Sequence, residues 1–324
     1  SQGHAVYASD TSFVTLTNSG TEVARLQLTH SNPVMKNNEN RFLTYGIGSA
    51  SYEISSFDET LYSGNAENKI YTGDVASNGT YCLVTEDNGY LTTLYAYSKN
   101  NNRIYKYSFS EYYITSVAIN KDGSGCVATG VSSDKGSAVT GVYVLDFSQE
   151  KPVSTYKISG DSVLDCKYLT SDTAVLVGSQ ASYIVKKGEK NYKTVSYEDK
   201  TLSNYCFNTD TSTYTMALSR SGDGRSVALI SYNSNGEAQY TINTEHKADS
   251  LSVYKGTVAI LDGNVVYGYN QNGDLLYSTN SGTGSKKIVL ASDYTAYILS
   301  VNQIRFIDLD SVSSDDTAQT SKQE

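Results

Sequence analysis

The chain has 324 residues, a net charge of −9, 29 tyrosines, no tryptophan and 39% hydrophobic residues. This hydrophobic fraction is sufficient for a large core, whereas the acidic excess disfavours nucleic acid, because phosphate binding requires a basic face. No run approaches the roughly 18 apolar residues of a membrane span. The first residues contain neither an initiator methionine nor a signal sequence, so we expect a trimmed start. The abundance of Ser, Thr, Asn and Tyr favours an exported bacterial protein.

Short runs of alternating apolar and polar residues extend from Ala5 to Leu309 and predict an all-β chain. One type of strand recurs as a landmark. It is found at residues 13–16, 52–54, 94–97, 142–145, 183–185, 227–230, 265–267 and 304–307. The landmarks are about 42 residues apart on average, within the range of about 40 to 50 residues for a four-stranded propeller blade. The sequence therefore predicts a β-propeller of four-stranded antiparallel blades, most simply eight, with seven as the alternative.

Each landmark follows another apolar strand, such as residues 80–84 or 173–177, and most precede a Gly or Asn turn, such as residues 234–236. By this template the first repeat lacks its opening strand and the last repeat lacks its closing strand. We expect the missing strands in sequence upstream of Ser1. Residues 1–310 are predicted to form a single propeller domain, and the acidic, serine-rich residues 311–324 a disordered tail.

Four cysteines, Cys82, Cys126, Cys166 and Cys206, recur at intervals of about 40 residues, similar to the repeat length. None of them forms the CxxC spacing of zinc or redox sites. We expect them at similar places in successive repeats as buried free thiols. A disulfide between neighbouring repeats is the alternative.

Two stretches resemble a known family. Residues 31–35 through 41–45 are similar to a second-blade segment, and residues 84–90 through 118–123 to a third and fourth blade. The family is an uncharacterised group of bacterial β-propellers, related to quinoprotein and WD40-like domains, whose members carry a membrane-spanning helix before the propeller. The resemblance implies a membrane-anchored extracytoplasmic domain with no assigned activity and no functional residues to carry over.

Sequence motifs for catalysis are absent. The lack of tryptophan argues against a quinone-dependent dehydrogenase, and residues 120–124 and 208–212 are better interpreted as turns than as calcium loops. His30 and His246 both follow fourth-strand runs, where we expect solvated loops, and His4 lies at the trimmed start. We predict no catalytic residue, no cofactor and no metal. A pair among the 34 acidic residues remains the basis of the alternative, a carbohydrate- or peptidoglycan-active enzyme.

Three longer loops are expected after second strands, at residues 86–90, 132–137 and 220–225. Equivalent loops of successive blades share one rim, and loops on a rigid scaffold commonly carry recognition. The candidate partner-binding residues on this rim are Glu86, Asp87, Tyr90, Asp134, Lys135, Arg220, Asp223 and Arg225.

The sequence thus favours a non-catalytic, extracytoplasmic interaction module that binds a protein or a cell-wall component through this rim. We expect the full-length protein at the cell surface, in contact with the membrane only through an upstream helix, and without a nucleic-acid partner.

Overall fold

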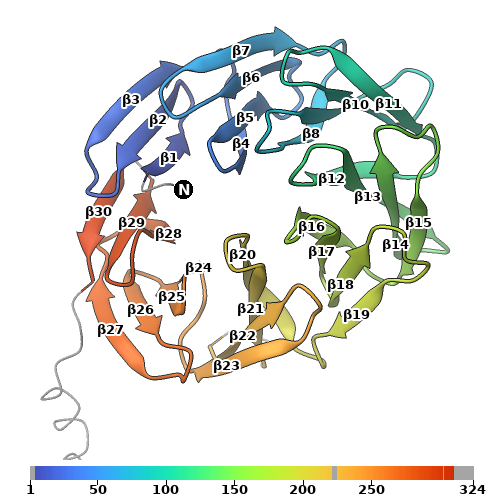
Figure 1. Ribbon diagram of the computed structural model, residues 1–324. Coiled ribbons are helices and arrows are strands. Elements are labelled where there is room, and N and C mark those ends of the chain that lie inside the picture. The colour runs from blue at the N-terminus through green and yellow to red at the C-terminus, as the bar shows by residue number, and fades with distance from the viewer. Residues whose placement is uncertain (1–3, 221–224, 302, 310–324) are drawn as a thin grey trace, which may run out of the picture. The chain divides into compact units, whose positions relative to one another are not determined.

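The computed structural model describes residues 4–220, 225–301 and 303–309, in two compact units, Ser1–Ser196 and Tyr197–Glu324. In these residues every regular element is a β-strand, and the strands form eight antiparallel sheets, six of four strands and two of three. Within each sheet every strand pairs with its neighbours in sequence, so each sheet is a meander (Figure 1). The all-β prediction is confirmed, and the number of sheets is eight rather than seven.

The first unit contains five sheets, β1–β3, β4–β7, β8–β11, β12–β15 and β16–β19. The strands are β1 (His4–Ala8), β2 (Ser12–Thr17), β3 (Glu22–Gln27), β4 (Pro33–Asn38), β5 (Arg41–Gly46), β6 (Ser51–Ser55), β7 (Thr60–Asn65), β8 (Ile70–Val75), β9 (Tyr81–Thr85), β10 (Thr92–Tyr97), β11 (Arg103–Phe109), β12 (Tyr113–Ile119), β13 (Gly125–Asp134), β14 (Ser137–Asp146), β15 (Ser154–Ser159), β16 (Val163–Tyr168), β17 (Thr173–Gly178), β18 (Ala181–Lys186) and β19 (Lys193–Ser196).

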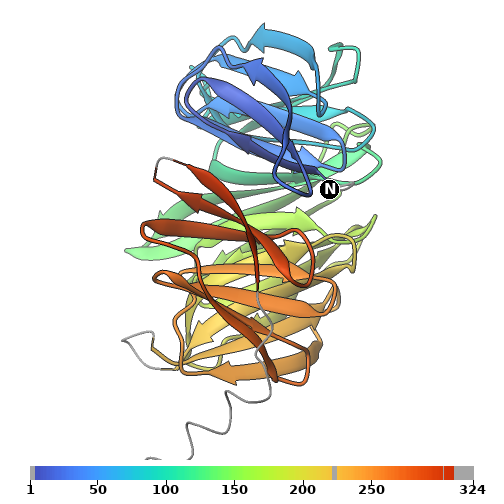
Figure 2. The ribbon, with the colours of Figure 1, turned by 90° about the vertical axis from the view of Figure 1, so that its left-hand side faces the viewer.

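The second unit contains three sheets, β20–β23, β24–β27 and β28–β30. The strands are β20 (Thr201–Asn208), β21 (Thr213–Ser219), β22 (Val227–Asn233), β23 (Ala238–Thr244), β24 (Ser250–Tyr254), β25 (Thr257–Asp262), β26 (Val265–Tyr269), β27 (Leu275–Asn280), β28 (Ser285–Leu290), β29 (Thr295–Ser300) and β30 (Ile304–Asp308). Figure 2 shows the twist within individual sheets, for example in the red β28–β30 sheet.

All eight landmark runs lie in third strands of the template, from β2 in the first sheet to β30 in the last. The β1–β3 sheet has no first strand, and the β28–β30 sheet has no fourth strand, among the residues that the structure describes. The prediction of two incomplete repeats is therefore confirmed. The upstream origin of the missing strands and the single-domain boundary stay predictions, and the predicted tail lies outside the described residues.

Hydrophobic clusters between consecutive sheets form the core of each unit. Between β8–β11 and β12–β15, for example, Leu94, Phe109 and Ile114 are no more than 2% exposed. β-branched and aromatic side chains suit these pleated, buried faces, and burying them supplies most of the stability. Because consecutive sheets within a unit hide their apolar faces against each other, the repeats of that unit stabilise one another.

Tyrosines pack between sheets, and several of their hydroxyls form hydrogen bonds inside the protein. The hydroxyls of Tyr52 and Tyr81 lie 3.1 Å apart in the core between the β4–β7 and β8–β11 sheets. Burial raises the pKa of Tyr52 to about 12. The ring of Tyr81 also stacks on Tyr97, with 5.0 Å between the centroids. These contacts use the apolar body and the polar tip of tyrosine together.

The four cysteines are free, and Cys82, Cys126 and Cys166 are buried, whereas Cys206 is half-buried. They do not share one place in the repeat, contrary to the prediction. Cys82 and Cys126 lie on the second strands β9 and β13, but Cys166 and Cys206 lie on the first strands β16 and β20. The reason is the ten-residue length of β13 and β14. This longer repeat moves the equivalent of Cys126 in the next sheet beyond Cys166.

Candidate functional site

A β-bulge interrupts the first strand of five sheets. The bulged residues are Tyr71, Thr115, Leu164, Ser203 and Lys286. Each bulge is followed by a polar residue; these are Thr72, Ser116, Asp165, Asn204 and Lys287. Because a bulge breaks the strict alternation of a strand and re-aims the side chains beside it, it places a polar group where an unbroken strand would place its neighbour.

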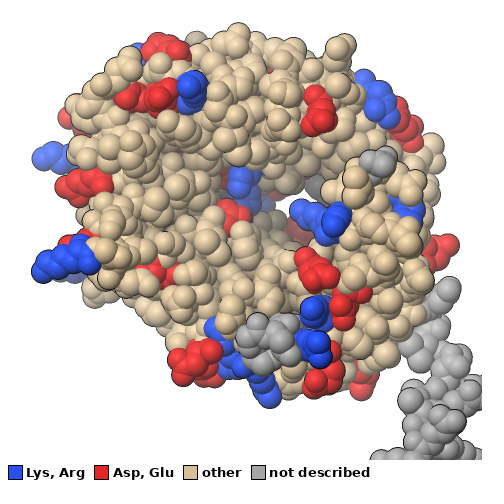
Figure 3. Space-filling model, turned by 180° about the vertical axis from the view of Figure 1, so that it is seen from behind, with Lys and Arg blue, Asp and Glu red and all other residues tan. Residues whose placement is uncertain are grey.

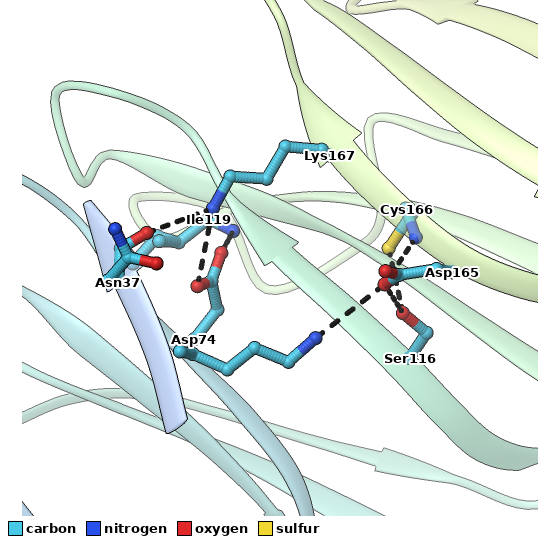
Figure 4. Close-up of polar contacts among 8 residues, drawn as sticks. Asn37, Asp74, Ser116, Ile119, Asp165, Cys166 and Lys167 are labelled. Carbon is cyan, nitrogen blue, oxygen red and sulfur yellow. Dashed lines mark hydrogen bonds and ion pairs between the residues drawn. The ribbon is translucent and has the colours of Figure 1, made fainter. Parts of the chain in front are cut away.

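In the first unit, β4, β8, β12 and β16 line a cavity of about 150 Å³. Its lining residues are Met35, Lys36, Asn37, Asp74, Val117, Asp165, Cys166 and Lys167. Figure 4 shows how side chains from these strands converge, although residues such as Asn37 and Lys167 are 130 positions apart in sequence. We call this cavity the polar pocket.

On one side of the polar pocket, Asp165 is held by neighbouring groups (Figure 4). Its Oδ1 accepts a 3.2 Å hydrogen bond from the Ser116 hydroxyl and a 2.9 Å bond from the Cys166 backbone N–H. The Cys166 thiol lies 3.2 Å from the same hydroxyl. Burial raises the pKa of Cys166 to about 12, so this thiol is protonated at neutral pH.

On the other side, Asp74 is only 2% exposed. Its Oδ2 accepts a 3.0 Å hydrogen bond from the backbone N–H of Ile119, on the neighbouring sheet. Its Oδ1 accepts no hydrogen bond from any residue that the structure describes. The nearest cation is the Lys167 ammonium, 3.8 Å from Oδ1, which donates a 3.2 Å hydrogen bond to the carbonyl oxygen of Asn37 instead. Figure 4 shows Lys167 above the Asp74 carboxylate.

A second ammonium, that of Lys36, lies 3.6 Å from Oδ1 of Asp165. Burial by itself would lower the pKa of Lys36, but the carboxylates of Asp165 and Asp74 outweigh burial and raise it. The polar pocket therefore holds two ammonium groups and two carboxylates, whose charges sum to zero. It can offer N–H donors and a buried acceptor to one small ligand.

Sequence reasoning missed these residues. Their signal is a charged side chain inside an otherwise apolar strand, as at Asp74 in β8 and at Asp165 and Lys167 in β16. Burying such a group is costly unless it is paired. The pattern alone marks the residues as unusual, but their convergence depends on the placement of four separate sheets.

The predicted rim residues that the structure describes lie in or beside connections between second and third strands. Glu86, Asp87 and Tyr90 follow β9, and Tyr90 is 52% exposed. Asp87 is not free, because it accepts hydrogen bonds from the Thr93 hydroxyl and the Gly89 backbone N–H. In the second unit, Arg220 and Arg225 are exposed beside the equivalent connection after β21. Asp223 lies outside the described residues.

The structure corrects the prediction of a loop at residues 132–137. β13 continues to Asp134 and β14 begins at Ser137, so only Lys135 and Gly136 form the turn. Both have positive φ, 52° and 83°, as a two-residue hairpin turn of the mirror-image type requires. The polar residues before Asp134 look loop-like, but cross-strand pairing extends the strand. Asp134 and Lys135 are exposed at the tip, where Asp134 pairs with Lys157 at 3.0 Å.

Large exposed apolar side chains share this edge of the first unit. Ile47 is 66% exposed, Tyr90 and Tyr113 are both 52% exposed and Leu164 is 53% exposed. Each lies in a connection between second and third strands or near the start of a first strand. We call these four residues the apolar edge.

Backbone contacts join the sheets along the apolar edge. The connection after β5 donates to the start of β8, through Gly48 N–H and the Ile70 carbonyl oxygen at 3.0 Å. The start of β16 is tied to β14, since Val163 N–H donates to the Thr140 hydroxyl at 3.1 Å. Burial raises the pKa of Tyr71, and Glu86 and Tyr113 raise it further. The polar pocket lies farther along the first strands, toward their ends.

The structure corrects the expected environment of His30. This residue is 5% exposed rather than solvated, because the segment after β3 packs on β6. There, Oε1 of Glu53 accepts hydrogen bonds from the backbone N–H and the hydroxyl of Thr29. His246 is half-buried, with its ring stacked on Tyr267 at 3.5 Å between centroids.

The two calcium-like loops are turns, as interpreted from the sequence. Oδ1 of Asn120 accepts from Gly125 N–H, and Oδ1 of Asp122 accepts from Ser124 N–H. Oδ1 of Asn208 likewise accepts from Asp210 N–H. These oxygens are used by the backbone, which explains the favoured Asn and Asp at such turns.

Charged side chains of both signs are scattered over the surface seen in Figure 3, and most of that surface is uncharged. Within residues 4–220, 225–301 and 303–309, no helix is long and apolar enough to cross a membrane.

Several solved structures are similar in fold to this chain. The C-terminal WD40 domain of Sif2 matches with a TM-score of 0.60 and 15% identity, over 84% of this chain and 78% of that one. A eukaryotic initiation factor matches with a TM-score of 0.63 and 10% identity, over 94% of this chain and 82% of that one. BamB from Moraxella catarrhalis matches with a TM-score of 0.56 and 13% identity, over 95% of this chain and 94% of that one. At these identities the likeness shows the fold alone.

The chain is therefore an all-β propeller with eight blades. It belongs to a family of unknown function, DUF5711, whose model matches residues 2–309. No match was found among curated proteins.

Proposed function

We propose that this chain is a non-catalytic binding module that holds a protein partner on the apolar edge of the first unit. The observation that carries the proposal is the exposure of four large apolar side chains, Ile47, Tyr90, Tyr113 and Leu164, at one edge. The four residues come from four consecutive sheets, β4–β7 to β16–β19, and connections on a rigid scaffold commonly carry recognition, whereas single exposed apolar groups are ordinary.

The chemistry of the edge favours a protein over a glycan. Tyr90 and Tyr113 could stack on either kind of partner. Ile47 and Leu164 have no aromatic face for a sugar ring and no hydrogen-bonding group, so they are best covered by apolar side chains. Glu86 is a charged neighbour that would form part of a polar rim around this centre. A cell-wall glycan is the competing partner.

The predicted location is extracytoplasmic, with the propeller anchored by an upstream membrane helix. The composition and the resemblance of the blade segments to a membrane-anchored family support this location. Labelling intact cells with a membrane-impermeant amine reagent tests it, because exposed lysines such as Lys135 should react before lysis. Labelling of these lysines only after lysis would contradict the proposed location.

The partner site is tested by cross-linking in cells that express the full-length protein with four substitutions, Ile47→Ser, Tyr90→Ala, Tyr113→Ala and Leu164→Ser. The matched control carries Leu61→Ser and Ile104→Ser, which are 43% and 44% exposed on the fourth strands β7 and β11. The edge variant should lose a cross-linked protein that the wild type and the control retain. Equal cross-linking by both variants would remove the apolar edge from the proposal, and capture of purified glycan strands alone would favour the cell wall.

The enzyme alternative depends on the two carboxylates of the polar pocket, Asp74 and Asp165. Each carboxylate has a lysine ammonium within 4 Å, so the pocket presents paired charges of the kind that hold a polar ligand. The pair therefore favours binding over acid catalysis. Release of fragments from purified peptidoglycan by the wild type, but not by Asp74→Asn, would reverse this conclusion.

A further inference from the structure

The polar pocket contains one acceptor that its own side chains leave unused. Oδ1 of Asp74 is buried and accepts no hydrogen bond from the described residues. Most buried polar atoms in folded proteins have a hydrogen-bond partner, and a charged acceptor without a hydrogen bond is costlier than a neutral one. Asp74 is one of the residues that line the cavity, so this carboxylate lies beside any molecule bound there.

The same pocket contains unused donors. The Lys36 ammonium is 3.6 Å from Asp165, longer than a normal hydrogen bond, and its side chain is 29% exposed. The Lys167 ammonium donates once, to the Asn37 carbonyl oxygen, and is 21% exposed. An ammonium has three N–H donors. Both lysines can therefore donate to an anionic group without breaking the hydrogen bond to Asn37.

Charge and size restrict the ligand. With two lysines and two aspartates the lining is neutral, so a ligand with a net charge would leave one group uncompensated. A zwitterion avoids this, because its ammonium can face Asp74 while its carboxylate faces the lysines. A cavity of about 150 Å³ accepts a molecule of roughly six non-hydrogen atoms, the size of benzene. Alanine has this size and this pair of charges.

We propose that the polar pocket binds a small free α-amino acid of the size of alanine, with its ammonium donating to Oδ1 of Asp74 and its carboxylate accepting from Lys36 and Lys167. This site goes beyond the proposed partner-binding function, and it uses none of the residues of the apolar edge. An experiment can therefore contradict one of the two proposals without contradicting the other.

The test is calorimetric titration of the full chain with alanine, compared with three relatives of the ligand. Lactate lacks the ammonium, isopropylamine lacks the carboxylate, and leucine is too large. Alanine should bind saturably, and each of the other three at least tenfold more weakly. No saturable heat with alanine, or equal affinity for lactate, would overturn the proposal.

Variants locate the site. Lys36→Met and Asp74→Asn should each weaken alanine binding at least tenfold. The matched control Lys157→Met, which removes a lysine paired with Asp134 on the surface, should leave binding unchanged. Asp74 also accepts from Ile119 N–H, so Asp74→Asn can fail to fold. In that case two measurements decide the assignment. These are the affinity of Lys36→Met for alanine and the NMR shift of the wild-type Lys36 ammonium on adding alanine. Unchanged affinity in Lys36→Met, or an unmoved Lys36 signal at saturation, would contradict the assignment.

Discussion

The Tyr183 hydroxyl donates a 2.8 Å hydrogen bond to Oδ2 of Asp161, whose residue is only 3% exposed. The same carboxylate accepts from the backbone N–H groups of Ser179 and Gln180, in the connection between β17 and β18, and of Ala181 at the start of β18. One buried side chain thus ties the connection between β15 and β16 to the turn between β17 and β18.

Replacing the Asp161 carboxylate should destabilise the protein strongly. Asp161→Ala leaves several buried donors without an acceptor, and we expect it to lower the free energy of unfolding by about 3 kcal/mol. The matched Tyr183→Phe removes only one hydrogen bond and should cost about 1 kcal/mol. Urea unfolding of both variants measures the difference. If Asp161→Ala cost no more than Tyr183→Phe, the carboxylate would not organise the turn.

The buried His30 predicts a loss of stability in mild acid. Burial lowers the pKa of His30, and the Glu53 carboxylate only partly opposes this effect. The unfolded chain takes up a proton near pH 6.5, which the folded chain resists. The contribution of His30 is therefore complete above about pH 6.5 and is lost as the pH falls below it. Thermal unfolding between pH 5 and 8 should show a smaller loss on acidification for His30→Gln than for the wild type. Identical pH profiles would contradict the prediction.

In the second unit, Gly268 on β26 allows a close approach of Tyr277. A Cβ at Gly268 would lie 2.0 Å from the ring of Tyr277, which is completely buried. Gly268→Ala must displace this ring and should destabilise the protein by about 3 kcal/mol. Gly256→Ala is the control, because its Cβ would meet only the flexible end of Gln271, at 3.0 Å. Denaturant midpoints of the two variants should differ clearly, and equal midpoints would mean that Tyr277 moves at little cost.

The thiols should be inert in the folded protein. Burial raises the pKa of Cys126 and of Cys166, so the reactive thiolate is scarce at neutral pH. Iodoacetamide followed by mass spectrometry should modify all four cysteines in urea. In the native protein we expect the half-buried Cys206 to react first and Cys82, Cys126 and Cys166 to react at least about 100-fold more slowly than in urea. Rapid native modification of Cys126 would show that this core opens easily.

The repeats could be predicted from the sequence because their signals are local. A run such as residues 94–97 alternates with period two, and turns such as residues 234–236 contain the glycine that the backbone conformation needs, with φ of 69° at Gly236. Even the two missing strands followed from comparing repeats, and both absences hold among the described residues.

The polar pocket could not be predicted in the same way. It needs Lys36 and Lys167 from strands of different sheets to meet, and it needs the bulge at Leu164 to present Asp165. Neither of these two features can be recognised in a short stretch of sequence. The prediction of a loop at residues 132–137 was wrong for a related reason. Cross-strand pairing keeps residues 132–134 in a strand despite their polar side chains. His30 likewise looks like a loop residue until a neighbouring sheet covers it.

The bulge that recurs on first strands places different polar side chains at equivalent positions of the sheets. Thr72, Ser116, Asp165 and Asn204 all follow a bulge on a first strand, yet they differ in size, charge and hydrogen-bonding capacity. The apolar contacts between sheets are made largely by other positions. Of these four side chains, Asp165 lines the polar pocket, so its replacement would change the polar groups offered to a ligand while the blades and their packing persist.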